Sequence, residues 1–274
     1  MAKYYYLISS LPELFFEAGH FKNSDFLHLR DYILENISDG DAVYVHDLLG
    51  NIDNYNLIAA VYGKRRAWKK GGKYDEFRSP DDSEKPVLPE YMSDFLEYID
   101  SYKAEYKTNP DEPAAEKYLS ELYYDKMESS DNPFIAKWFK FDREMKNIQT
   151  AYTGRRTGIS AENYFVKKDD ITEFLLKNAS PDFGLSRERD YVPDLFRALE
   201  TPNLLERENR LDMLRWNQID EINIMEYFSI DVALGILQKA CIADRWLALD
   251  SVEGKKMFRK LVDDLIEFKK VKIV

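Results

Sequence analysis

Apolar residues recur every three to four positions along most of the chain, the spacing of helices with one apolar face. The first such stretch, residues 24–37, begins at Ser24, a residue type that favours helix N-termini. A second, longer helix over residues 41–65 is expected to end near Gly63, where basic residues follow. The same spacing returns in residues 89–106, 114–127, 132–156, 169–178, 190–200, 204–228, 230–249 and 254–271. Only the tyrosine-rich start, residues 4–7, suggests an extended segment. The pattern therefore predicts an all-α protein.

One stretch interrupts the helical pattern. Residues 66–86, RAWKKGGKYDEFRSPDDSEKP, combine glycine, proline and charged residues without apolar periodicity. Such a composition is typical of a surface loop. We expect an extended loop here, part of it mobile.

A ten-residue phrase occurs twice in the chain. NLIAAVYGKR starts at Asn56 and NIQTAYTGRR starts at Asn147, so the interval is 147 − 56 = 91 residues. An acidic residue, Asp53 or Glu144, precedes each asparagine by three positions. The shared pattern is acid-x-x-Asn-aliphatic-x-x-Ala-x-x-Gly-basic, and its offsets place these residues along one stripe of a helix.

The composition of this stripe predicts a structural role. The alanines and the glycines, Gly63 and Gly154, permit close approach of another backbone, while a buried carboxylate and amide require hydrogen-bond partners. We interpret each stripe as a tight helix–helix seam with a polar clasp, formed by Asp53 and Asn56 in one copy. Glu144 and Asn147 form the second clasp. The alternative, that the acids bind metal or act in catalysis, is disfavoured because neither stripe has histidine or a second carboxylate at ligand spacing.

Composition narrows the possible functions. The net charge of −11 argues against a general nucleic-acid binder, since affinity for phosphates requires clustered positive charge. No stretch approaches the ~20 apolar residues of a membrane helix, so direct membrane insertion is not expected. Cys241 is the single cysteine, and we expect it to be a buried structural thiol. We therefore predict a soluble, acidic, cytoplasmic protein.

No motif for catalysis or cofactor binding is present in the sequence. GKRRAWKKGGK lacks the spacing of a phosphate-binding loop, and the three histidines have no metal-ligand spacing. G-x-S-x-G, H-E-x-x-H and C-x-x-C are absent. The aromatic clusters YYY, LYY and WFKF are more typical of core than of a ligand cavity. We predict no catalytic residues, no cofactor and no metal.

The repeated phrase near the end of a long helix resembles the C subunit of V/A-type ATPases, called the d subunit in eukaryotes. A late helix with the sequence IDVALGILQKACIADRW and the following EGKKMFRKL are also similar to that family. The opening KYYYLISSLPEL resembles a bacterial family of unknown function that is associated with V-type ATPases. The insertion between Gly63 and Pro86 and the divergent third copy depart from the family pattern.

The resemblance implies a three-lobed, all-helical, funnel-like fold with internal pseudo-repeats over residues 1–274. The first lobe would be 1–85, including the loop 66–86. The second would be 86–158, and the third, divergent lobe 159–274. It also implies partner contacts by Arg65, Arg66 and Trp68 in the basic part of the loop.

The resemblance further implies a function. The chain would be a non-catalytic subunit that couples the central rotor stalk to the membrane ring, peripheral to the inner face of the cell membrane. Its partners would be the stalk and ring subunits. Two alternatives stay open: an independent cytoplasmic helical scaffold that binds other proteins, and a helical enzyme with an aromatic pocket.

Overall fold

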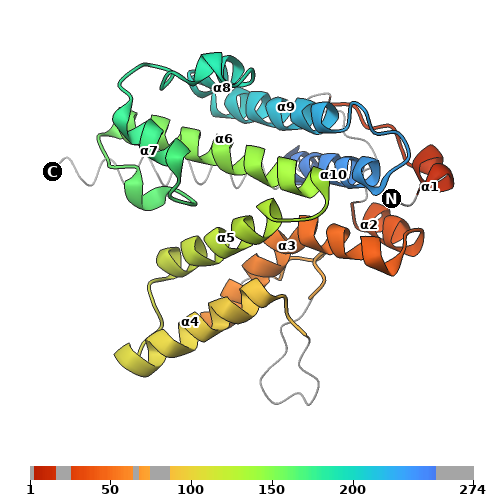
Figure 1. Ribbon diagram of the computed structural model, residues 1–274, viewed down its shortest axis with the longest axis horizontal. Coiled ribbons are helices and arrows are strands. Elements are labelled where there is room, and N and C mark those ends of the chain that lie inside the picture. Colours follow the sequence, from red (N-terminus) through yellow and green to blue (C-terminus); the bar gives the residue numbers. More distant parts are fainter. Residues whose placement is uncertain (1–2, 17–25, 64–67, 75–86, 251–274) are drawn as a thin grey trace.

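A computed structural model describes residues 3–16, 26–63, 68–74 and 87–250 of the 274-residue chain (Figure 1). Within these ranges the chain forms ten α-helices and two short 3-10 helices, and no strand. The prediction of an all-α protein is confirmed. The α-helices are α1 (Tyr5–Ser10), α2 (Phe26–Glu35), α3 (Asp39–Val61), α4 (Glu90–Tyr106), α5 (Glu112–Glu128), α6 (Pro133–Thr157), α7 (Asp170–Lys177), α8 (Val192–Leu199), α9 (Leu204–Ile222) and α10 (Ile230–Asp250).

Short polar side chains fix where several helices begin. Asn132 accepts a hydrogen bond from the amide of Ile135 at the start of α6, and Pro133 occupies the first helical position. Ser38 caps α3 in the same way. Asp169 forms a reciprocal capping box with Thr172 at the start of α7. These residues satisfy amides that would otherwise have no partner at a helix N-terminus.

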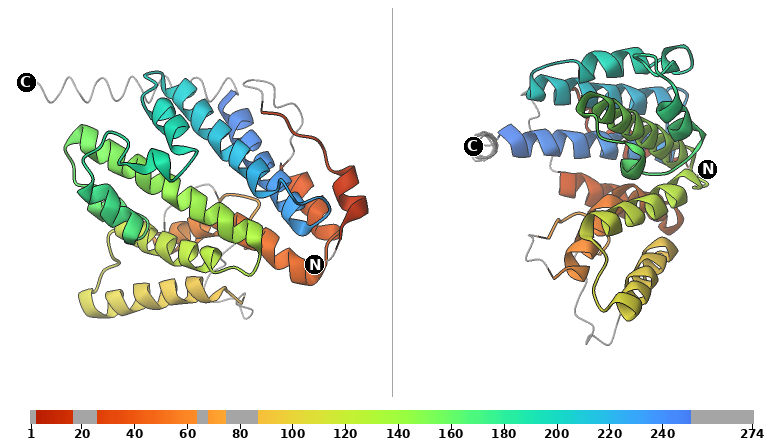
Figure 2. Two further views of the ribbon diagram at one scale, coloured as in Figure 1. Left: turned by 45° about the horizontal axis from the view of Figure 1, so that its top comes forward. Right: turned by 90° about the vertical axis from the view of Figure 1, so that its left-hand side faces the viewer.

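The helices pack around one continuous apolar core. Helix α10 contacts α2, α3, α6 and α9, while α5 contacts α3, α4 and α6. Figure 2 shows α6 and α10 between α9 on one side and α3 and α5 on the other. Buried residues from all three predicted lobes belong to this core, for example Leu48, Trp138 and Leu234.

One predicted type of secondary structure and one predicted helix boundary are wrong. Tyr5 to Leu7 begin a helix rather than an extended segment, because Leu7 is buried in the core and the Tyr4 amide bonds to the Phe228 carbonyl beyond α9. Helix α9 ends at Ile222 instead of continuing to residue 228. The Asn223 side chain donates to the carbonyl of Asp231 at 2.9 Å and so turns the chain back toward α10. Ser24 and the expected helix at 254–271 lie outside the described residues.

No helix in the described ranges is both long and apolar enough to cross a membrane.

Candidate functional site

The first polar clasp lies on α3 and is occupied by the segment 68–74. Asn56 is fully buried, accepts a hydrogen bond from the Lys69 amide at 3.0 Å and donates to the Lys69 carbonyl at 2.9 Å. The Asp53 carboxylate, one turn earlier, accepts from the amides of Lys73 at 3.0 Å and Tyr74 at 2.9 Å. Four backbone groups of the loop are thereby bound by two helix side chains.

Two glycines allow this close approach. Gly71 has a φ of +111°, a backbone conformation that side chains disfavour. A Cβ at Gly72 would lie 2.1 Å from an Asp53 carboxylate oxygen, so no other residue fits without displacing the clasp. This part of the expected loop 66–86 is therefore bound to α3.

The second clasp lies on α6 and holds two later segments. Asn147 is fully buried, and its Oδ1 accepts from the amide of Val166 at 3.0 Å. Its Nδ2 has no hydrogen-bond partner within the described part of the chain. Glu144 accepts from Arg189 Nε at 3.0 Å and from the Tyr191 hydroxyl at 3.1 Å. Burial, followed by the charge of Glu144, raises the pKa of Tyr191.

These partners correct the interpretation of a helix–helix seam. In both copies the asparagine binds the backbone of a loop that follows its own helix. The bound residue lies 13 positions later in the sequence for Asn56 and 19 positions later for Asn147. A loop amide is a better partner for a buried amide side chain than a helix surface, because the backbone groups of a helix already bond one another.

The two glycines of the repeated phrase have different roles. Gly63 lies just beyond the end of α3 with a φ of +58°, and a Cβ there would meet no atom within 4 Å. It therefore ends the helix. Gly154 lies inside α6, where a Cβ would be 2.7 Å from the Ile159 carbonyl oxygen. Helix α6 instead ends at Thr157, and Gly158, whose φ is +73°, follows as its C-cap.

Of the three predicted partner-contact residues, the structure describes Trp68. Trp68 is 42% exposed, at the start of the segment held by Asn56. Arg65 and Arg66 lie outside the described residues. Arg155, the second copy's equivalent of Lys64, donates to the carbonyls of Ser180 and Asn178, each at 2.6 Å. Its guanidinium carbon lies 3.8 Å from the centre of the Phe183 ring.

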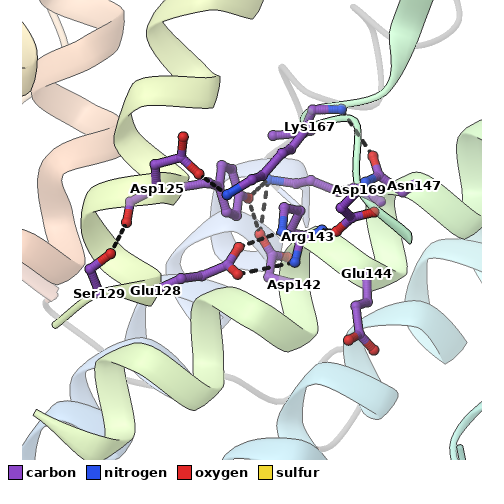
Figure 3. Close-up of polar contacts among 12 residues, drawn as sticks. Asp125, Glu128, Ser129, Asp142, Arg143, Glu144, Asn147, Lys167 and Asp169 are labelled. Carbon is purple, nitrogen blue, oxygen red and sulfur yellow. Dashed lines mark hydrogen bonds and ion pairs between the residues drawn. The ribbon is translucent and has the colours of Figure 1, made fainter. Parts of the chain in front are cut away.

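Arg143 is a central buried charge that sequence reasoning did not identify. It lies between the two acids of α6 and forms a two-pronged pair with Glu128 on α5 (Figure 3). Another guanidinium nitrogen donates to Asp169, the residue that caps α7. Arg143 therefore joins three helices. Burial opposes its charge, but the hydrogen bonds and charges of Glu128 and Asp169 outweigh this effect and raise its pKa.

A second charge network lies on another face of α6. The Asp142 carboxylate accepts from the Tyr124 hydroxyl, pairs with Lys146 at 2.9 Å and lies 3.6 Å from Arg215 on α9. Burial opposes ionisation of Asp142. The positive charges of Lys146 and Arg215, with the hydrogen bonds, overcome it and lower the pKa from 3.8 to about 2.

The network extends from Arg215 to α10. Arg215 also pairs at 2.9 Å with Asp212, which is almost completely buried. Asp212 in turn accepts from Arg245 and, at 2.8 Å, from the indole of Trp246. Ion pairs thus link α6, α9 and α10, and the hydrogen bond from Tyr124 joins α5 to the same network.

A cleft of about 560 Å³ opens beside this network, between α3, α5, α6, α9 and α10. Aromatic side chains line it, among them Tyr123, Tyr124, Trp138 and Phe139. The charged residues of the network, Asp142, Lys146, Asp212, Arg215 and Arg245, also line it. Cys241 lies on its wall and is half-buried rather than fully buried as expected; this burial and then the charge of Asp244 raise the thiol pKa to about 12. A thiol with this pKa is protonated and a poor nucleophile at neutral pH.

The geometry of the cleft fits a structural role. Asp142 and Asp212 are each bound by cationic side chains and hydrogen-bond donors of neighbouring helices, so both carboxylates help to hold the helices around the cleft together. The described ranges contain no group of three or more histidine, cysteine, aspartate or glutamate side chains that could hold a metal ion.

The fold and these sites define an all-helical protein in which buried polar groups on two long helices hold loops and neighbouring helices in place. The chain belongs to the family described as a protein of unknown function (DUF2764), whose model matches residues 1–268. No curated protein and no solved structure matches the chain.

Proposed function

We propose that this chain is a non-catalytic subunit of a V-type ATPase that couples the central rotor stalk to the membrane ring. The observation that supports this proposal most directly is the parallel between the two clasps. In α3 and in α6 an acid and an asparagine, three residues apart, hold the chain that follows the helix. This parallel favours an origin of the two segments as pseudo-repeats, as the resemblance to the stalk-to-ring coupling subunit of V/A-type ATPases implies.

The buried networks also suit a part that transmits torque. A coupling subunit must keep its helices in register under load. Arg143 ties α6 to α5 and α7, and Asp142 with Arg215 and Asp212 ties α6 to α9 and α10. A fully paired buried network admits few alternative arrangements, because moving one member leaves another charge without a partner.

The proposal includes the finer architecture expected from the sequence. The lobes 1–85, 86–158 and 159–274 would surround a funnel, with stalk and ring subunits as partners at the inner face of the cell membrane. Trp68, with Arg65 and Arg66, would contact one of these partners.

The test is affinity purification of the tagged full-length chain from detergent-solubilised membranes of its native cell, followed by mass spectrometry. The untagged strain is the control, and ATP hydrolysis in the extract demonstrates that the motor is intact. We expect catalytic-head, stalk and ring subunits to co-purify in constant proportion.

If an intact ATPase is present in the extract and none of its subunits co-purifies, the proposal is wrong. The independent helical scaffold would then be the better interpretation, because the same rigid networks would serve a protein that binds other partners.

A further inference from the structure

Helix α1 meets the turn between α9 and α10 at one end of the molecule (Figures 1 and 2). Large apolar side chains of both segments are exposed there and form one surface. Its exposed fractions range from 36% for Phe228 to 78% for Tyr6. We call it the aromatic surface, and it consists of Tyr5, Tyr6, Ile224, Met225, Tyr227 and Phe228. Large apolar side chains gathered in this way are typical of protein interfaces, in which tyrosine, phenylalanine and methionine are enriched.

One backbone hydrogen bond and one ring contact join the two halves of the aromatic surface, α1 and the α9–α10 turn. The Tyr4 amide donates to the Phe228 carbonyl at 2.7 Å, and the rings of Tyr5 and Phe228 are 4.6 Å apart. The Tyr4 hydroxyl also donates to Asp41, which attaches α1 to the first turn of α3.

The turn itself is clamped to α10. The Asn223 side chain donates to the Asp231 carbonyl, and a Cβ at Gly235 would lie 2.3 Å from Asn223 Nδ2. Little conformational entropy would be lost when a partner binds such a preformed surface.

The surroundings of the aromatic surface are acidic. The segments that build and border it, residues 3–10, 38–43 and 220–231, have Lys3 as their one cationic side chain. The acidic residues of these segments that are not buried are Asp39, Asp41, Asp220, Glu221 and Glu226, while Asp231 is buried. Glu226 and Asp41 lie close enough to Asp231 that, after burial, their charges raise its pKa. Lys137 on α6 and Lys239, paired with Asp220, offset part of this charge.

We infer that the aromatic surface is a docking site for a protein segment with an apolar face flanked by lysine and arginine. The apolar face would cover the tyrosines and Met225, and the basic flanks would face the acidic border. An anionic membrane surface fits less well, because the acidic border would repel it. This inference goes beyond the proposed function, since it specifies the surface and the chemistry of the partner whichever complex the chain belongs to.

The test is site-specific photo-crosslinking of the full-length chain in its native cell. Tyr6 is replaced by p-benzoylphenylalanine, and the cross-linked peptides are identified by mass spectrometry. The matched control carries the same photoreactive residue at Tyr164, which is also exposed (66%) but lies in a different part of the chain. We expect the Tyr6 probe to capture a segment rich in apolar and basic residues, with a yield at least about 10-fold above that of the Tyr164 probe.

Two variants of Met225 that carry opposite charges test the chemistry of the partner. Met225→Lys places a cation in the aromatic surface and is expected to lower the Tyr6 cross-link on the order of 10-fold, whereas Met225→Glu lowers it less. Both variants must retain the wild-type urea midpoint, which an exposed position permits.

Capture of an acidic segment, of a second copy of this chain or of lipid would overturn the inference. A yield no higher than at Tyr164, or equal losses from the two Met225 variants, would also overturn it. Whether the captured protein is an ATPase subunit tests the proposed function separately.

Discussion

Replacing Asn56 by leucine tests whether the clasp on α3 contributes to stability. Leucine has nearly the same size but can neither accept from the Lys69 amide nor donate to its carbonyl, bonds of 3.0 and 2.9 Å in the native chain. A neutral hydrogen bond contributes about 0.5–1.5 kcal/mol net, so two would contribute about 1–3 kcal/mol. Lys69 is exposed, and water can replace part of what it loses. We therefore expect a loss of about 1–2 kcal/mol in the free energy of unfolding.

The measurement is urea unfolding followed by far-ultraviolet circular dichroism. With an m-value of about 3 kcal/mol/M, the expected loss lowers the urea midpoint by roughly 0.5 M. Asn51→Leu is the matched control, because Asn51 lies on the same helix but is exposed. Its free energy of unfolding should change by no more than about 0.5 kcal/mol.

Hydrogen exchange locates the effect. Amide exchange in residues 68–74 should accelerate in Asn56→Leu and stay at the wild-type rate in Asn51→Leu, because only the first variant releases the loop. A wild-type midpoint together with unchanged exchange in this segment would refute the argument that the clasp holds it.

Three further predictions concern Gly72, Asp142 and Cys241. Gly72→Ala should lower the free energy of unfolding by about 2–4 kcal/mol, because the added Cβ displaces the Asp53 carboxylate. Gly40→Ala is the control, since the nearest atom to a Cβ there is 3.9 Å away. Equal urea midpoints of the two variants would contradict the prediction. The pKa of Asp142 is lowered to about 2, so its stabilisation is present above pH 3.8 and is lost as the pH falls toward about 2. Asp142→Asn should therefore lower the free energy of unfolding by about 2 kcal/mol near neutral pH, and the variant should lose less stability than the wild type as the pH falls toward about 2. An equally steep loss of stability in the variant and the wild type over this pH range would disprove the prediction. Cys241, the single cysteine, should react with iodoacetamide only after unfolding in urea, and full labelling of the folded chain, measured by mass spectrometry, would show that its thiol is not suppressed.

The sequence predicted local features well because they depend on neighbouring residues. Asn132 followed by proline and an apolar run predicts the start of α6, and the structure has the asparagine as its N-cap. Gly63 predicts the end of α3, since it supplies the left-handed conformation that ends a helix. The failure at Tyr5 is instructive, because α1 depends on the burial of Leu7 against distant helices.

The candidate site was predictable only in part. A repeated acid and asparagine on a helix indicated buried polar groups that need partners, but spacing cannot identify those partners. The sequence did not indicate that Arg143 is buried, because an arginine between two acidic residues, Asp142 and Glu144, is typical of a solvent-exposed position. Its burial is possible only because Glu128 and Asp169, from two other helices, neutralise its charge.

The sequence by itself determined the helical class, most helix boundaries and the presence of two matched polar stripes, because apolar periodicity, caps and glycines act within a few residues of chain. The tertiary structure decided that each asparagine binds a loop, that Gly63 and Gly154 have different roles, and that α1 joins the α9–α10 turn in one exposed surface. These outcomes depend on groups far apart in the sequence whose hydrogen bonds and charges are satisfied only when the whole chain has packed.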